Sequence, residues 1–121
     1  MPKSADIYIR HMLDAIKNIE ADIKGHDFES FRADRRTRQL VERNLEIISE
    51  ASRRLPQDLK DIENAVPWKQ IAGIGNVIRH DYHTVFPTAL WQTCRKELKP
   101  LKLAIMRIAQ VLAADGKKAK D

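Results

Sequence analysis

Apolar residues recur at helical spacing along the first part of the chain. Between residues 4 and 24 they fall mostly three or four positions apart, a spacing that places them on one face of an α-helix. Ser4 is a suitable N-cap and Gly25 a suitable stop. The sequence therefore predicts a first helix over residues 4–24, with an apolar face made of Ile7, Ile9, Leu13, Ile16, Ile19 and Ile23.

A second helix is predicted over about residues 29–54, because Pro56 ends the periodic pattern. Its apolar stripe consists of Leu40, Val41, Leu45, Ile48, Ser52 and Leu55. Glutamates recur every four residues along another face, where a row of charges is typical of a solvated surface: Glu42, Glu46 and Glu50. One of them could instead orient His80 in a dimer. The opening turns are strongly basic and are candidates for lining an RNA path or docking an acidic partner: Arg32, Arg35, Arg36, Arg38 and Arg43.

Prolines divide the rest of the chain. A short helical piece is expected over residues 57–64, and Pro67 suits the first position of the next helix. Pro87 marks the start of another, and residues 87–99 and 100–114 read as two helical stretches broken or kinked at Pro100. The pattern predicts an all-α antiparallel bundle of four or five helices. We assign residues 1–114 to one domain and residues 115–121 to a flexible basic tail.

Composition narrows the classes of protein to which the chain can belong. A chain of 121 residues is long enough for one core, and its single cysteine, Cys94, excludes an internal disulfide and a cysteine-based zinc site. No apolar run reaches the roughly 20 residues of a membrane span, so we expect a cytoplasmic protein without a membrane partner. The net charge of +5 is compatible with a polyanionic partner such as nucleic acid.

The stretch GIGNVIRHDYHTVFP, residues 73–87, concentrates polar and titratable side chains. On a helix of about 100° per residue, one face of residues 68–83 is apolar: Trp68, Ile71, Ile74, Gly75, Ile78 and Tyr82. The opposite face is polar, with the small residues Ala72 and Gly73 beside it: Asn76, Arg79, His80 and His83. A neighbouring backbone could approach at those small residues. We interpret this polar face as a binding or catalytic surface.

Two kinds of chemistry fit these side chains. His80 and His83 are three residues apart and could bind a metal, but no clear third ligand is present, so we expect neither a metal nor a cofactor. Cleavage of RNA by its own 2′-hydroxyl needs an acid–base group and cations instead. A histidine suits the proton transfers, and an arginine suits the phosphate. A second copy of the helix across a two-fold axis would complete such a site.

The runs VERNLEIISEASRRLP, VPWKQIAGIGNVIRHDY and ALWQTCRKELKPLK resemble the HepT-like toxins of the HEPN superfamily, over nearly the whole body to about residue 112. The resemblance implies an all-helical homodimer that acts as a metal-independent endoribonuclease toxin, with a composite site at the dimer cleft. It also implies a type VII toxin–antitoxin pair, in which the partner is a minimal nucleotidyltransferase (MNT) antitoxin.

The family motif is an arginine, a polar residue, then histidine after four intervening residues, any residue and tyrosine. Here Asn76 matches the polar residue, His80 the histidine and Tyr82 the tyrosine, while the arginine position is occupied by Gly75. Our hypothesis is that Arg79, about 6 Å further along the helix and about 40° around it, contacts the phosphate instead. The expected catalytic residues are therefore His80, Arg79 and Asn76.

The resemblance gives Tyr82 a second role, as the acceptor of AMP transferred by the nucleotidyltransferase, which would silence the toxin. The alternative is a core aromatic with a solvated hydroxyl. Possible RNA-binding residues are His83, Arg35, Arg36 and Arg43. Because Gly75 replaces the motif arginine, a second reading stays open: a catalytically weak subunit that partners a nucleotidyltransferase and presents nucleic acid or nucleotide to it.

Overall fold

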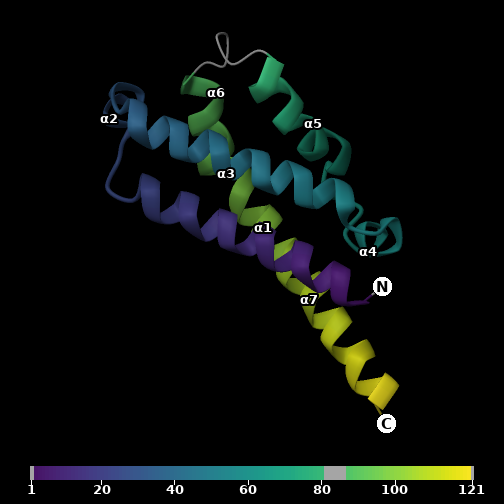
Figure 1. Ribbon diagram of the computed structural model, residues 1–121. Coiled ribbons are helices and arrows are strands. Elements are labelled where there is room, and N and C mark those ends of the chain that lie inside the picture. Colours follow the sequence, from purple (N-terminus) through teal and green to yellow (C-terminus); the bar gives the residue numbers. More distant parts are fainter. Residues whose placement is uncertain (1, 81–86, 121) are drawn as a thin grey trace.

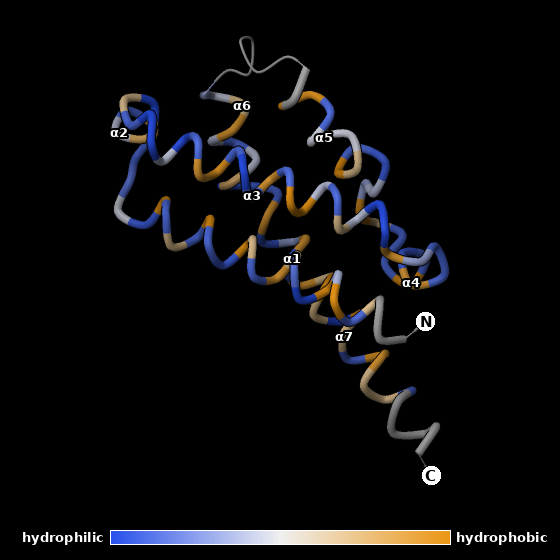
Figure 2. Tube along the Cα trace, in the orientation of Figure 1, coloured by the Kyte–Doolittle hydropathy of each residue, from blue (hydrophilic) through white to orange (hydrophobic). Residues whose placement is uncertain are grey.

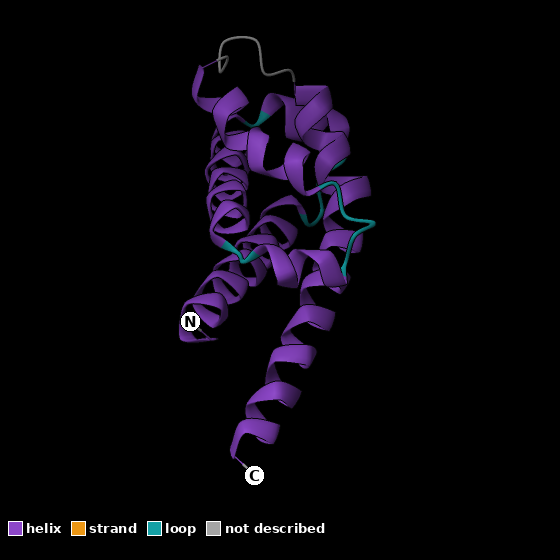
Figure 3. Ribbon diagram, turned by 90° about the vertical axis from the view of Figure 1, so that its right-hand side faces the viewer, coloured by secondary structure: helices purple, strands orange, loops and turns teal. Residues whose placement is uncertain are grey.

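The computed structural model describes residues 2–80 and 87–120, with side chains described for residues 5–78 and 87–115. Within these residues the chain is helical and contains no strand. The long helices pack side by side as a bundle, and the C-terminal helix extends beyond its lower end (Figures 1 and 3). The all-α fold class predicted from the sequence is confirmed.

The first helix, α1 (Pro2–Ile23), begins before the position that the sequence suggested. The prediction that Ser4 is the N-cap is wrong, because the helix already includes Pro2, and a proline is well tolerated in the first turn of a helix. Gly25 follows the helix with a φ of 82°, a left-handed conformation that glycine adopts without strain. The predicted stop at Gly25 is confirmed.

The predicted second helix is two helices, α2 (Phe28–Ala33) and α3 (Arg35–Arg54). The break is at Asp34, whose backbone is extended and whose side chain accepts a hydrogen bond from the backbone N–H of Thr37 at 3.0 Å. Asp27 caps α2 in the same way, accepting from the N–H of Ser30 at 2.8 Å. Sequence periodicity missed this break because a single residue separates the two helices.

After α3 the chain turns at Pro56 into α4 (Gln57–Ile62) and then enters α5 (Trp68–His80). Pro67 immediately precedes α5, so its prediction as the first helical residue is off by one position. The indole Nε1 of Trp68 donates to the carbonyls of Lys60 and Glu63 at 3.0 and 3.1 Å. These bonds fix the start of α5 against the end of α4.

The last part of the chain forms α6 (Pro87–Gln92), a π-helical turn η1 (Thr93–Glu97) and α7 (Leu98–Lys120). Pro87 begins α6 as predicted, but the second break does not fall at Pro100, which lies inside α7. The irregularity precedes it: the N–H of Leu98 donates to the carbonyl of Thr93. A proline removes an N–H and crowds the carbonyl four residues earlier, which accounts for a widened turn just before Pro100.

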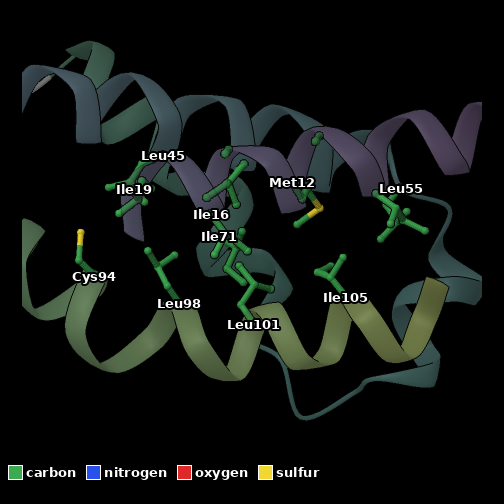
Figure 4. Packing of buried hydrophobic residues seen from close by; sticks show 14 of the residues in the cluster. Met12, Ile16, Ile19, Leu45, Leu55, Ile71, Cys94, Leu98, Leu101 and Ile105 are labelled. Carbon is green, nitrogen blue, oxygen red and sulfur yellow. The ribbon is translucent and has the colours of Figure 1, made fainter. Parts of the chain in front are cut away.

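The core is formed mainly by α1, α3 and α7, and most of its buried residues are isoleucines, leucines and alanines (Figure 4). α3 returns antiparallel to α1 (Figure 1), and apolar and polar turns alternate along both helices (Figure 2). Most of the predicted apolar positions are buried, whereas Ile7 and Leu40 are about half exposed. The largest fully buried apolar side chains are Phe31, Met12, Ile16, Ile19, Val41, Ile48, Ile105 and Ile108.

Trp91 of α6 packs against Phe31 of α2, with 5.1 Å between the ring centroids, and the guanidinium of Arg95 lies 5.5 Å from the Trp91 ring. Both tryptophans are partly buried against the core. They act as structural anchors. Among the described residues, no helix is both long enough and apolar enough to span a membrane.

Candidate functional site

The inward face of α5 matches the face predicted from the sequence. Ile71 and Ile78 are buried, Gly75 is buried between them, and Trp68 and Ile74 pack partly buried against the core. This apolar side holds the helix on the bundle and leaves its other side open.

A buried serine joins α5 to α3. The hydroxyl of Ser49, which has no exposed surface, donates to the carbonyl of Ala72 at 2.8 Å and accepts from the N–H of Gly75 at 3.0 Å. A hydroxyl can make both bonds at once because it carries one donor and two lone pairs. The two bonds fix the register of α5 against α3. We call this contact the Ser49 bridge.

The position of the motif arginine lies inside this contact. Gly75 is buried and its N–H is bonded to Ser49, so its backbone is close to α3. By contrast, a Cβ added at Gly73 would meet no atom within 4 Å. The close approach of another helix therefore occurs at Ala72 and Gly75. The expectation that Gly73 also permits a close approach is not met within this chain, where that position is open.

Asn76 is exposed on α5, on the side away from the core, as predicted. Arg79 and His80 occupy the last turn of α5, and their side chains are outside the described part of the chain. Tyr82 and His83 also lie outside the described residues. The helix thus places positions 76, 79 and 80 within two turns of one another on an element that the Ser49 bridge holds in register.

The three candidate RNA-binding arginines of α3 are all exposed. Arg43 lies 3.9 Å from Glu46, a long and weak ion pair, and lines a shallow hollow of about 510 Å³ between α1 and α3 with Tyr8, His11 and Arg54. Arg35 lies about 80° around α3 from Arg43, and Arg36 about 20° from it. The three side chains do not converge on one point.

The glutamates of α3 differ in their surroundings. Glu50 is exposed and pairs with Arg54 and Arg53 at 3.0 and 2.8 Å, and the hydrogen bond from Arg54 is the main reason that its pKa is lowered. Glu42 is half-buried, and burial raises its pKa, against the opposing effect of Arg38. The sequence indicated one solvated row, so the partly covered carboxyl of Glu42 is a feature that it missed.

An apolar groove of about 390 Å³ runs along the open side of α5. Val77, which is 52% exposed, and Gly73 lie on its α5 side, and Ala89 and Thr93 on the other. The lining of this groove is mainly apolar. Among the side chains that the structure describes, no three histidines, cysteines, aspartates or glutamates form a group able to hold a metal ion.

Comparison with known proteins places the chain in a family. Residues 12–108 match the family described as Ribonuclease HepT-like. The chain therefore belongs to this HepT-like family.

Curated relatives cover nearly the same span. A protein of Thermococcus cleftensis named "Probable ribonuclease HepT" is 34% identical over 102 residues, which is 84% of this chain and 93% of the relative. A protein of Caldanaerobacter subterraneus subsp. tengcongensis named "Putative RNase TTE0752" is 34% identical over 103 residues, 85% of this chain and 92% of the relative. No solved structure matches the chain.

Proposed function

We propose that this protein is a metal-independent endoribonuclease whose chemistry is carried by the last turns of α5. The observation that carries the proposal is the sequence pattern of Asn76, His80 and Tyr82, of which the first two positions lie on a helix held in register by the Ser49 bridge. The family match and the ribonuclease names of two relatives support it. The substrate is RNA and the protein needs no cofactor.

In this reaction the ribose 2′-oxygen attacks the adjacent phosphorus while the bond to the 5′-oxygen breaks. A base removes the proton of the 2′-hydroxyl, and an acid gives a proton to the departing 5′-oxygen, so that the products are a 2′,3′-cyclic phosphate and a 5′-hydroxyl. His80 performs proton transfer, since imidazole titrates near neutral pH. Arg79 and Asn76 bind the phosphate oxygens on which negative charge develops.

Arg79 replaces the motif arginine in this proposal. Position 75 is buried and its N–H is bonded to Ser49, so we expect that a long side chain there would crowd α3. Position 79 is one turn further along α5, about 6 Å by helical rise, which is within the length of an extended arginine side chain.

The site is completed by a second copy of the chain. The groove beside Gly73, Val77 and Ala89 is apolar, exposed and adjacent to the last turns of α5. A second copy packed over this groove across a two-fold axis would bring two sets of His80 and Arg79 to one cleft. Arg35, Arg36, Arg43 and His83 would extend the path of the RNA beyond that cleft.

We further propose that the protein is the toxin of a type VII HEPN/MNT toxin–antitoxin pair. The partner nucleotidyltransferase would transfer the AMP group of ATP to the hydroxyl of Tyr82 and release pyrophosphate, which would place a bulky anion beside the phosphate-binding side chains. Incubation with that nucleotidyltransferase and ATP should add the mass of one AMP group to the chain and suppress cleavage. A Tyr82→Phe protein should gain no mass and keep its activity.

The reaction class is tested with one pair of oligonucleotides in the presence of EDTA. An RNA that the protein cleaves is compared with the same sequence carrying a 2′-deoxy sugar at the cleavage position. We expect cleavage of the first only, with 2′,3′-cyclic phosphate ends. Cleavage of both substrates, or activity only after a divalent metal is added, would rule out the proposed mechanism.

A second candidate function rests on Gly75. Without the motif arginine, the protein could act as a catalytically weak subunit that binds a nucleotidyltransferase and presents nucleic acid or nucleotide to it. A dimer that binds RNA and the nucleotidyltransferase but cleaves no RNA pool under any metal condition would favour this candidate.

A further inference from the structure

An apolar cavity of about 280 Å³ lies between α5 and α7, on the side of α5 that faces the core. Its walls come from α3, α5 and α7 and from the segment that joins α4 to α5. Leu98 and Leu101 point from α7 toward the interior of the bundle (Figure 4). The main apolar residues of the lining are Leu45, Ile48, Ile71, Ile74, Leu98 and Leu101.

The cavity is the space between two helices that make few contacts with each other. α5 packs chiefly on α3, whereas α7 packs on α1 and on the π-helical turn η1. A charged pair joins the two sides of the cavity: Arg107 of α7 donates to the carboxylate of Glu63 through Nε at 3.0 Å and Nη2 at 2.6 Å. Glu63 belongs to the segment between α4 and α5, so this pair ties the start of α5 to α7.

The π-helical turn η1 contributes another part of the wall. Thr93, Lys96 and Glu97 of this turn line the cavity, and so does Pro100, which follows it. A π-helical turn is rare within a helix, and such turns occur frequently at functional sites. The irregular part of the last helical stretch therefore coincides with the cavity.

The apolar lining favours an occupant. Protein interiors contain few voids larger than a water molecule, because side chains beside a void lose the contacts of close packing. Val66 and Ile74 line the cavity and are only partly buried, although both pack against the core. A molecule in the cavity would cover these side chains and would gain the free energy of burying its own apolar surface.

The size of the cavity indicates how large this molecule is. An engineered apolar cavity of about 150 Å³ in another protein binds benzene, a single ring. The cavity between α5 and α7, at about 280 Å³, is nearly twice as large. It therefore suits a molecule with two rings and is too small for a helix of a partner protein.

The charged residues of the lining indicate that the molecule is uncharged. There are two carboxylates, Glu63 and Glu97, and two cations, Lys96 and Arg107, so their formal charges cancel. Glu63 and Arg107 are moreover bonded to each other. A charged ligand would lose its hydration in an apolar cavity without a net opposite charge to compensate.

We propose that this cavity is a binding site for an uncharged apolar molecule with two rings, and the proposal is independent of the ribonuclease function. The molecule packs against Ile71 and Ile74 of α5 on one side and against Leu98 and Leu101 of α7 on the other. It thereby joins two helices that otherwise make few contacts with each other.

The test is calorimetric titration of the unmodified protein with indole, an uncharged molecule with two fused rings. We expect saturable binding of one indole per chain. At a free indole concentration of about ten times the dissociation constant, the unfolding equilibrium constant in urea should fall about tenfold, because indole binds the folded chain. An absence of saturable binding would overturn the proposal. Equally tight binding of indole-3-acetate, an anion of similar shape, would overturn the assignment of an uncharged ligand.

A pair of substitutions on α7 locates the bound indole. Ala104 is almost completely buried and lines the cavity, so Ala104→Leu fills part of the space and should weaken indole binding at least about tenfold. Ala109→Leu adds the same side chain at a partly buried position outside the lining and should leave the affinity unchanged. Equal affinities of the two variants would place the indole elsewhere and contradict the proposal.

A second filling variant keeps the test decisive if Ala104→Leu does not fold. Val66 lines the cavity from the segment between α4 and α5, where it is partly buried. Val66→Phe adds an aromatic ring from outside the helices and should also weaken indole binding. An unchanged affinity in folded Val66→Phe would contradict the assigned site.

Discussion

The two contact surfaces of α3 are built differently. Toward α1 and α7, the helix contributes Val41, Ile48 and other side chains that are almost completely buried in an apolar core. Toward α5, it contributes the hydroxyl of Ser49, bonded to two backbone groups of the neighbouring helix. Apolar packing is not directional, whereas a hydrogen bond fixes the relative position of its atoms. The first surface stabilises the bundle, and the second sets the register of the helix that carries the candidate catalytic turn.

The largest effect is expected from breaking the apolar surface. Ile105 of α7 has no exposed area. Ile105→Ala should lower the free energy of unfolding by about 2–5 kcal/mol through lost burial and the cavity that remains. Urea denaturation measures this loss. Because Ile105 lies on α7 and takes no part in the Ser49 bridge, cleavage per folded molecule should not change. A large fall in kcat under folding conditions would show that the two contact surfaces of α3 do not have separate roles.

Gly75→Arg is a direct test of the buried motif position. It restores the residue that the family motif has, but places a long side chain in the contact with α3. Overfilling a packed site costs about 1–3 kcal/mol, so we expect lower stability and no gain in cleavage. Thermal unfolding and the RNA assay, run on the same preparation, measure both quantities. A stable and more active Gly75→Arg protein would show that the position opens toward the substrate.

Ser49→Ala removes the bridge without adding volume. The loss of stability should be about 1–2 kcal/mol, because the carbonyl of Ala72 and the N–H of Gly75 lose the hydroxyl to which they are bonded. Cleavage should fall by more than this loss of stability explains, since α5 is no longer held in register.

Ser52→Ala is the matched control for this substitution. The hydroxyl of Ser52 is equally buried but donates to the carbonyl of Ser49 within its own helix, at 2.7 Å. Its loss should affect stability only. Equal effects of the two substitutions on cleavage would remove the special role of the bridge.

The smallest effect near neutral pH is expected at Cys94, which belongs to the apolar core. Burial raises the pKa of its thiol to about 12, above the ordinary value of 9.0. The unfolded chain therefore loses this proton at lower pH than the folded chain. The corresponding stability is complete below pH 9.0 and is lost as pH rises toward 12.

Comparison with Cys94→Ala isolates this contribution. The unmodified protein should lose stability more steeply above pH 9, by at most about 1.4 kcal/mol for each pH unit. Urea unfolding over roughly pH 8 to 11 measures the difference, because the thiol of the unfolded chain titrates within this range. Parallel curves for the two proteins would show that the thiol is accessible to solvent.

The apolar pattern predicted most of the scaffold, because Ile16, Ile48 and similar residues have no favourable place other than the core. It missed the break at Asp34, where one capping side chain is enough to end a helix and start the next. It also missed the widened turn before Pro100, because crowding of a backbone carbonyl has no periodic signature.

The candidate site was predicted less completely. Asn76 was assigned correctly to the exposed face of α5. Ser49 was not singled out, because a serine on a helix gives no sign of burial until its partner helix is known. Glu42 was grouped with Glu46 and Glu50, although only the packing of α3 distinguishes its half-buried carboxyl from the exposed Glu50. Residues that act between helices are difficult to recognise in the sequence of either helix alone.

The central claim is that the last turn of α5 performs metal-free chemistry on RNA from a frame fixed by α3. The most direct measurement is the cleavage rate of a mixed RNA pool in EDTA, for the unmodified protein and for His80→Ala at equal folded concentration. We predict cleavage by the unmodified protein and a loss of at least about a hundredfold in the variant, the usual contribution of an acid–base group. Equal cleavage by the two proteins, or none by a folded unmodified dimer, would contradict the account.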